Sequence, residues 1–101
     1  ALAMLGDKIS AEEAEKMGMI YKTVPFEEFE ESISKLAIKL ANMPTMALGL
    51  IKELFNKSMT NTLENQLALE SKLQIEAASS NDYAEGVAAF IEKRKPNFKG
   101  N

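Results

Sequence analysis

The sequence predicts a mainly α-helical fold with about five helices and one short extended strand. Apolar residues recur every three or four positions over most of the chain, which is the period of a helix with one buried face. Only residues 19–24 are rich in the β-branched and aromatic types that favour an extended chain. Capping residues, glycines and prolines divide the chain at intervals that suit short helices.

The amino-acid composition argues against several classes of function. The chain has 101 residues, enough for one domain, and its hydrophobic fraction of 46% is that of a folded protein. A net charge of −3 argues against non-specific nucleic-acid binding, which requires a basic surface. The absence of cysteine excludes disulfides and thiol catalysis, and because histidine is also absent we expect no metal site.

The sequence predicts neither a membrane-spanning helix nor a signal peptide. No apolar run approaches the roughly 20 residues that a membrane helix needs, and residues 1–10 lack the pattern of a signal peptide. We therefore expect a cytoplasmic protein. Residues 1–5 resemble the end of a helix whose beginning lies elsewhere, so we also expect a fragment of a longer protein.

The first complete helix is predicted over Ala11–Met17. Ser10 and Glu13 have the spacing of a capping box, in which each side chain binds the other residue's backbone N–H. Gly18 stands where a left-handed C-cap is needed. The extended segment Met19–Val24 follows, and Pro25 ends it.

Three longer helices are predicted in the middle of the chain. Pro25 can serve as the first helical position of the first one, whose apolar positions run from Phe26 to Leu40. Pro44 separates it from a second helix that contains Met46–Phe55, and the polar residues 56–62 are expected to form a loop. The third covers Leu63–Ala78, and its apolar surface is wider than one stripe, which predicts packing on more than one side.

The last helix carries the candidate site. It is predicted to begin with a second capping-box spacing, Asp82–Glu85, so that Tyr83 is already helical, and to end at Pro96. Phe90 and Lys93 are three residues apart, so on a helix they are neighbours. An aromatic ring beside cations suits a nucleotide, because the ring covers a base and the ammonium pairs with a phosphate. The alternative is that the cations of residues 93–95 only complement the helix dipole, and the residues alone favour this alternative.

Other residues suggest no further site. Glutamates cluster in residues 12–15 and 27–31, beside helix starts, where a solvated face is expected rather than acid–base catalysis. Gly49 and Gly86 fall inside predicted helices, at a cost of about 1 kcal/mol each relative to alanine. Close helix packing is the expected reason, and the close approach of a ligand is the alternative.

Three stretches resemble one family. GDKISAEEAEKMGMIYKTVP, residues 6–25, is similar to the segment that follows the catalytic core in the crotonase superfamily, the enoyl-CoA hydratases and isomerases. DYAEGVAAFIEKRKPNFKG, residues 82–100, resembles the closing signature of that family, and PTMALGLIKELFNKS also fits, with Lys52 at a recurrent lysine. LENQLALESKLQ followed by SSNDYAEGVAAF is more similar to isomerases of the phenylacetate-degradation type than to short-chain hydratases.

The resemblance implies the C-terminal helical segment of a crotonase-like fold. Residues 1–24 would be the end of the core region, and residues 25–101 a helical domain that covers part of the CoA site and forms a homo-oligomer, a trimer or a hexamer. The parent enzyme would hydrate or isomerise an acyl-CoA thioester through an enolate held in an oxyanion hole. CoA would enter as part of the substrate, with no prosthetic group.

The same resemblance locates the oxyanion hole and the catalytic glutamates before the first residue of this chain. We therefore predict no catalytic residue here and no activity for the isolated chain. In some family members the phenylalanine and lysine that match Phe90 and Lys93 contact CoA, which favours these two as binding residues over the dipole alternative. Two other functions stay open: a freestanding helical acyl-CoA-binding module and an oligomerisation module without catalysis.

Overall fold

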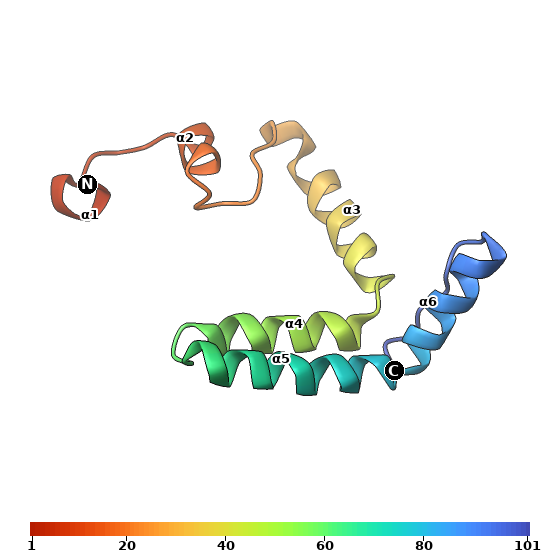
Figure 1. The fold of residues 1–101 in the computed structure, drawn as a ribbon. Coiled ribbons are helices and arrows are strands. Elements are labelled where there is room, and N and C mark those ends of the chain that lie inside the picture. Colours follow the sequence, from red (N-terminus) through yellow and green to blue (C-terminus); the bar gives the residue numbers. More distant parts are fainter. The chain divides into compact units, whose positions relative to one another are not determined.

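The computed structural model describes all 101 residues and contains six α-helices, one short 3₁₀ helix and no β-strand (Figure 1). The predicted mainly helical fold is confirmed. The chain divides into two compact units, residues 1–35 and 36–101. The division predicted after residue 24 concerns roles in a parent fold and stays a prediction. None of the helices combines the length and apolar character that crossing a membrane requires.

The first unit begins with α1 (Leu2–Leu5) and α2 (Ala11–Lys16). The predicted capping box of α2 is confirmed, because the Ser10 hydroxyl accepts from the Glu13 N–H at 3.1 Å and the Glu13 carboxylate accepts from the Ser10 N–H at 2.9 Å. Gly18 has a φ of 74° and ends the helix in a Schellman motif, as its left-handed conformation requires.

The predicted strand does not form. Met19–Val24 consists of bends and irregular chain, because a strand needs a partner for its backbone groups and this chain offers none. The segment is instead held by Glu15, whose carboxylate accepts from the Thr23 hydroxyl and from the Thr23 N–H, the latter at 2.7 Å. These bonds, the hydroxyl bond foremost, lower the pKa of Glu15.

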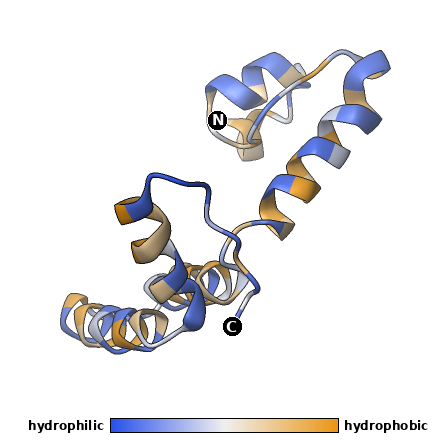
Figure 2. Cartoon of the chain, turned by 90° about the vertical axis from the view of Figure 1, so that its right-hand side faces the viewer, coloured by the Kyte–Doolittle hydropathy of each residue, from blue (hydrophilic) through white to orange (hydrophobic).

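The helix predicted after the extended segment begins as a 3₁₀ turn, η1 (Phe26–Glu28), and continues as α3 (Phe29–Ala41). Pro25 is the residue before the turn and not its first helical position. No residue of α3 is buried. Figure 2 shows hydrophobic residues in orange along this helix, among hydrophilic ones in blue. The exposed large hydrophobic side chains of α3 are Phe29, Ile33, Leu36, Ile38 and Leu40.

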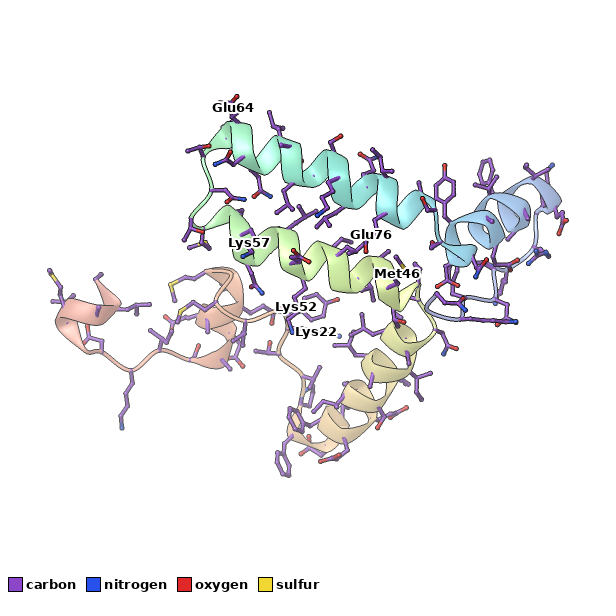
Figure 3. All side chains as sticks on the ribbon, turned by 90° about the horizontal axis from the view of Figure 1, so that it is seen from below. Lys22, Met46, Lys52, Lys57, Glu64 and Glu76 are labelled. Carbon is purple, nitrogen blue, oxygen red and sulfur yellow. The ribbon has the colours of Figure 1, made fainter.

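The second unit is built on a hairpin of α4 (Thr45–Ser58) and α5 (Leu63–Ala78), which lie side by side (Figure 1). The predicted loop at residues 56–62 is shorter than expected, since α4 continues to Ser58. Leu73 is buried between the helices, but Leu63, Leu67 and Ile75 of α5 are exposed. Lys52 is exposed on α4 and forms no ion pair (Figure 3).

The last helix, α6 (Asn81–Glu92), differs from its prediction at both ends. Its N-cap is Ser80, whose hydroxyl accepts from the Tyr83 N–H at 3.1 Å, so the predicted capping box at Asp82–Glu85 is wrong. Its C-terminus lies at Glu92 rather than at Pro96, because Lys93 has the left-handed conformation (φ 56°) that ends a helix.

Candidate functional site

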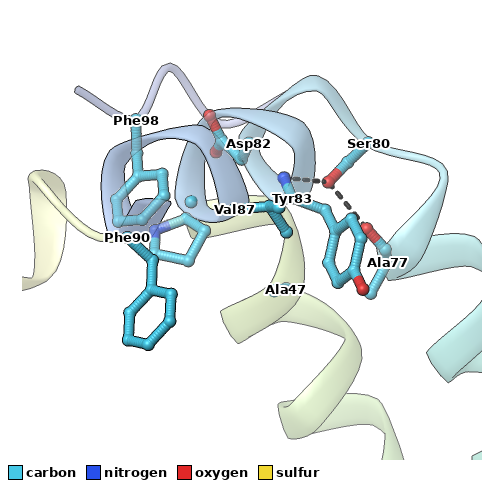
Figure 4. Close-up of a pocket in the computed structure, with 10 residues that line it drawn as sticks. Ala47, Ala77, Ser80, Asp82, Tyr83, Val87, Phe90 and Phe98 are labelled. Carbon is cyan, nitrogen blue, oxygen red and sulfur yellow. Dashed lines mark hydrogen bonds between the residues drawn. The ribbon is translucent and has the colours of Figure 1, made fainter. Parts of the chain in front are cut away.

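An open apolar pocket of about 380 Å³ lies along one face of α6 (Figure 4). A volume of this order is within the range of small-molecule sites. The start of α4, the end of α5, α6 itself and the C-terminal tail, residues 94–101, all contribute to it. The lining residues are Pro44, Ala47, Ala77, Ser80, Asp82, Tyr83, Gly86, Val87, Phe90 and Phe98.

Phe90 is the most exposed aromatic side chain of the pocket, at 85%, compared with 55% for Tyr83. Tyr83, Val87 and Phe90 share a face of α6 because they are spaced by four and three residues. Ala89, on another face, is buried and anchors the helix. An exposed ring over an apolar pocket leaves a flat surface free for a ligand.

Lys93 is not placed as the sequence predicted. It lies beyond the last residue of α6, so the helical spacing that would make its side chain a neighbour of Phe90 does not apply. Its N–H donates to the Phe90 carbonyl at 3.3 Å, and the Arg94 N–H donates to the Ala89 carbonyl at 3.0 Å, which is a Schellman motif. The Lys93 side chain is exposed, does not line the pocket and forms no ion pair. Its contact with CoA stays a prediction.

The tail runs back along α6, and Glu85 holds its first half. The Glu85 carboxylate accepts two bonds from the Arg94 guanidinium, at 2.6 and 2.8 Å, and one from the Asn97 N–H at 2.7 Å. The hydrogen bond from Arg94, followed by that from Asn97, lowers the pKa of Glu85 to about 2. Glu92 also accepts from Arg94, at 2.5 Å.

Asp82 holds the second half of the tail. Its two carboxylate oxygens accept from the N–H groups of Lys99, at 2.7 Å, and Gly100, at 2.8 Å. Its own N–H donates to the Asn101 carbonyl at 2.9 Å, so the chain end lies beside the start of α6 (Figure 1). Asp82 is only 3% exposed and is the one buried charged residue of the chain. We call Asp82, Glu85 and Arg94 the tail clamp.

The tail packs against α6 at Gly86. A Cβ built on Gly86 would lie 3.6 Å from the Phe98 ring, so the ring packs directly over the helix at this position. This is an ordinary van der Waals distance, so the contact does not by itself require a glycine, and close helix packing as the reason for Gly86 stays a prediction. For Gly49 nothing lies within 4 Å, so no contact within this chain explains it.

In the sequence, the residues of the tail clamp stand out only because they belong to residues 82–100, the stretch that resembles the closing signature of the family. The spacing of Asp82 and Glu85 is that of a cap, and no local rule connects them with amides 12 to 18 residues later. The one feature of the sequence that could have indicated the clamp is that this closing motif contains an aspartate, a glutamate, an arginine and a phenylalanine together. The structure brings these four into one arrangement around α6.

The chemistry available in this chain is binding chemistry. No group of three or more acidic side chains is arranged to hold a metal ion. Both oxygens of Asp82, the only buried acid, are occupied by tail amides, which leaves no free buried general base. The pocket can offer an aromatic face to a ligand, and the exposed lysines Lys93 and Lys95 lie outside its lining.

The whole chain, residues 1–101, matches the family model described as enoyl-CoA hydratase/isomerase. It is 48% identical over 99 residues to the 1,2-epoxyphenylacetyl-CoA isomerase of Escherichia coli (strain K12), covering 98% of this chain and 38% of that protein. It is 37% identical over 98 residues to the mitochondrial enoyl-CoA hydratase of Pongo abelii, covering 97% and 34%.

Solved structures agree with the sequence comparison. The crystal structure of an enoyl-CoA hydratase from Polaromonas sp. JS666 matches with a TM-score of 0.88 and 32% identity, covering 95% of this chain and 37% of that one. The chain thus spans well under half the length of the relatives it matches. The similarity to phenylacetate-degradation isomerases expected from residues 63–90 agrees with the isomerase from Escherichia coli.

Proposed function

The chain belongs to the enoyl-CoA hydratase/isomerase family, and we propose that it is the C-terminal part of an enzyme acting on acyl-CoA thioesters. In this proposal the pocket beside α6 holds the nucleotide end of CoA. The observation that carries it is Phe90, an 85% exposed ring at an apolar pocket of about 380 Å³.

Physical chemistry supports the assignment of Phe90 to the adenine. Stacking of a base on an aromatic side chain contributes about 1–3 kcal/mol. Lys93 and Lys95 follow on the chain, are exposed and have no carboxylate partner, so they are available to the phosphates. Because ion pairs between these lysines and the phosphates would be exposed, we expect them to contribute less to binding than the Phe90 ring and to weaken as the salt concentration rises.

The reaction itself belongs to the remainder of the parent enzyme. We propose double-bond isomerisation or hydration through a stabilised enolate, with the isomerase type favoured by the 48% identity to 1,2-epoxyphenylacetyl-CoA isomerase. The lack of a free buried base in this chain supports a role in substrate binding rather than proton transfer. The cytoplasmic location expected from the sequence stays a prediction.

A second role, formation of the parent homo-oligomer, is supported by the apolar side chains that α3 and α5 leave exposed. Surfaces of this kind mark contacts with other protein. Five exposed large hydrophobic residues lie on α3, and three on α5. A trimer or hexamer is the assembly we propose, and the mass of the full-length protein in solution tests it.

The experiment for the main proposal is the substitution Phe90→Ala in the full-length protein, assayed with crotonyl-CoA. Loss of one stacking contact should raise KM about tenfold, with kcat nearly unchanged, because the ring binds ground state and transition state alike. Phe26→Ala is the matched control, since Phe26 is similarly exposed, at 89% compared with 85% for Phe90, and lies outside the pocket. An unchanged KM in Phe90→Ala would refute the nucleotide contact.

A further inference from the structure

Phe98 is the only tail residue that lines the pocket, and it lies beside Phe90 in Figure 4. Its ring packs over Gly86, which is one helical turn before Phe90 on the same face of α6. The wall next to the proposed stacking ring is therefore supplied by a segment without secondary structure of its own.

The tail has few other means of staying in place. Beyond Lys93 its residues are exposed or half-buried, so burial of apolar surface contributes little to its position. Its N–H groups at Asn97, Lys99 and Gly100 all donate to carboxylates of the tail clamp. Hydrogen bonds to charged acceptors are shorter and stronger than neutral ones, which suits the anchoring of an irregular segment.

We propose that Glu85 and Asp82 are positioning residues for CoA recognition: through the tail they hold Phe98 against Gly86 and so fix the pocket wall beside Phe90. This inference rests on the proposed function, because it takes the nucleotide of CoA as the ligand of that pocket. It assigns Asp82 and Glu85 a role in substrate affinity that acts through the tail, because the carboxylates of both accept hydrogen bonds from tail N–H groups.

The test is Glu85→Gln in the full-length protein, assayed with crotonyl-CoA and with crotonyl-pantetheine, which lacks the nucleotide. The variant loses the charge that holds Arg94 and the Asn97 N–H. We expect KM for crotonyl-CoA to rise about fivefold, which is less than the full loss of one base–aromatic stacking contact would cause. The kcat and the KM for crotonyl-pantetheine should stay as in the unchanged protein, which a general loss of structure would not allow.

Glu92→Gln is the matched control. It makes the same change on the same helix and also removes an Arg94 contact, but Glu92 accepts no bond from the tail backbone. Its KM values should be unchanged. Phe98→Ala removes the wall without touching the clamp and should reproduce the pattern of Glu85→Gln, so the inference remains testable if Glu85→Gln does not fold.

Hydrogen exchange supplies an independent readout, because the Asn97 amide should exchange faster in Glu85→Gln than in Glu92→Gln. An unchanged crotonyl-CoA KM in Phe98→Ala, or in Glu85→Gln with a loosened tail, would overturn the positioning role. If Phe90→Ala raises that KM all the same, the proposed function stands and only the inference is lost. If Phe90→Ala also has no effect, both are refuted.

Discussion

At the scale of single residues, Glu85 sets a clear dependence on pH. Its pKa is lowered to about 2 from an ordinary value of 4.5 by Arg94 and by the Asn97 N–H. A lowered pKa means that the unfolded chain binds the proton more readily than the folded one. The stabilisation is therefore fully present above about pH 4.5 and is lost as the pH falls toward 2.

Carboxyl chemical shifts measured across this range by NMR should show Glu85 titrating near 2, and the Asn97 amide should lose its protection in step. In Arg94→Gln the titration should move back toward 4.5, because the largest cause of the shift is removed. A midpoint near 4.5 in the unchanged protein would contradict the clamp.

Lys93 occupies a conformation that favours glycine, with a φ of 56°. A side chain in the left-handed region costs about 1 kcal/mol relative to glycine. We expect Lys93→Gly to stabilise the end of α6 by about that amount, measured as slower exchange of the Arg94 amide, whose N–H closes the Schellman motif. Lys95→Gly, after the motif, should give no such gain, and equal effects would contradict the prediction.

Residue chemistry was only partly predictable from sequence. Ser10 and Gly18 behave as predicted because their partners are within a few residues. Asp82 and Glu85 do not, because their partners belong to a tail that must first turn back along the helix. The proposed nucleotide role of Phe90 rests on a family similarity, since an aromatic residue at a helix end has several physical uses.

At the scale of elements, Gly86 joins α6 to the tail. A Cβ at this position would lie at an ordinary contact distance of 3.6 Å from Phe98, so alanine fits. We expect Gly86→Ala to stabilise α6 by somewhat less than the helix-propensity difference of about 1 kcal/mol. Gly86→Leu should instead displace Phe98 and lower stability. Urea unfolding of both variants checks this, and a destabilised Gly86→Ala would show that the packing is tighter than described.

The helices were predictable as elements because their periodicity and most of their stop signals are local. The extended segment was not, because β-branched residues favour a strand only where a partner strand exists, and Met19–Val24 has none in this chain. The end of α6 also differs, since Lys93 takes the left-handed conformation although nothing in its side chain favours it.

At the scale of the whole molecule, the chain buries little apolar surface. Its buried hydrophobic residues are only Ala14, Leu73 and Ala89, whereas large hydrophobic side chains along α3, α4 and α5 are exposed. The isolated chain should therefore self-associate or rearrange in solution. Light scattering over a range of concentrations checks this, and a strictly monomeric mass at every concentration would contradict it.

The isolated chain should also be inactive. Asp82 is its only buried acid and is already bonded to the tail, so no free carboxylate has the buried setting that tunes an acid for proton transfer. With crotonyl-CoA, the absorbance of the conjugated thioester should not decay faster than without protein. Turnover above that background would show that catalytic residues are present in these 101 positions.

The central claim, that this part of the protein holds the nucleotide end of a CoA thioester, is tested most directly by calorimetry with 3′-phospho-ADP. This compound is the nucleotide half of CoA and carries no reacting group. The full-length protein should bind it, and Phe90→Ala should weaken the binding about tenfold while Phe26→Ala leaves it unchanged. Equal affinity in all three proteins, or no binding to the unchanged one, would contradict the claim.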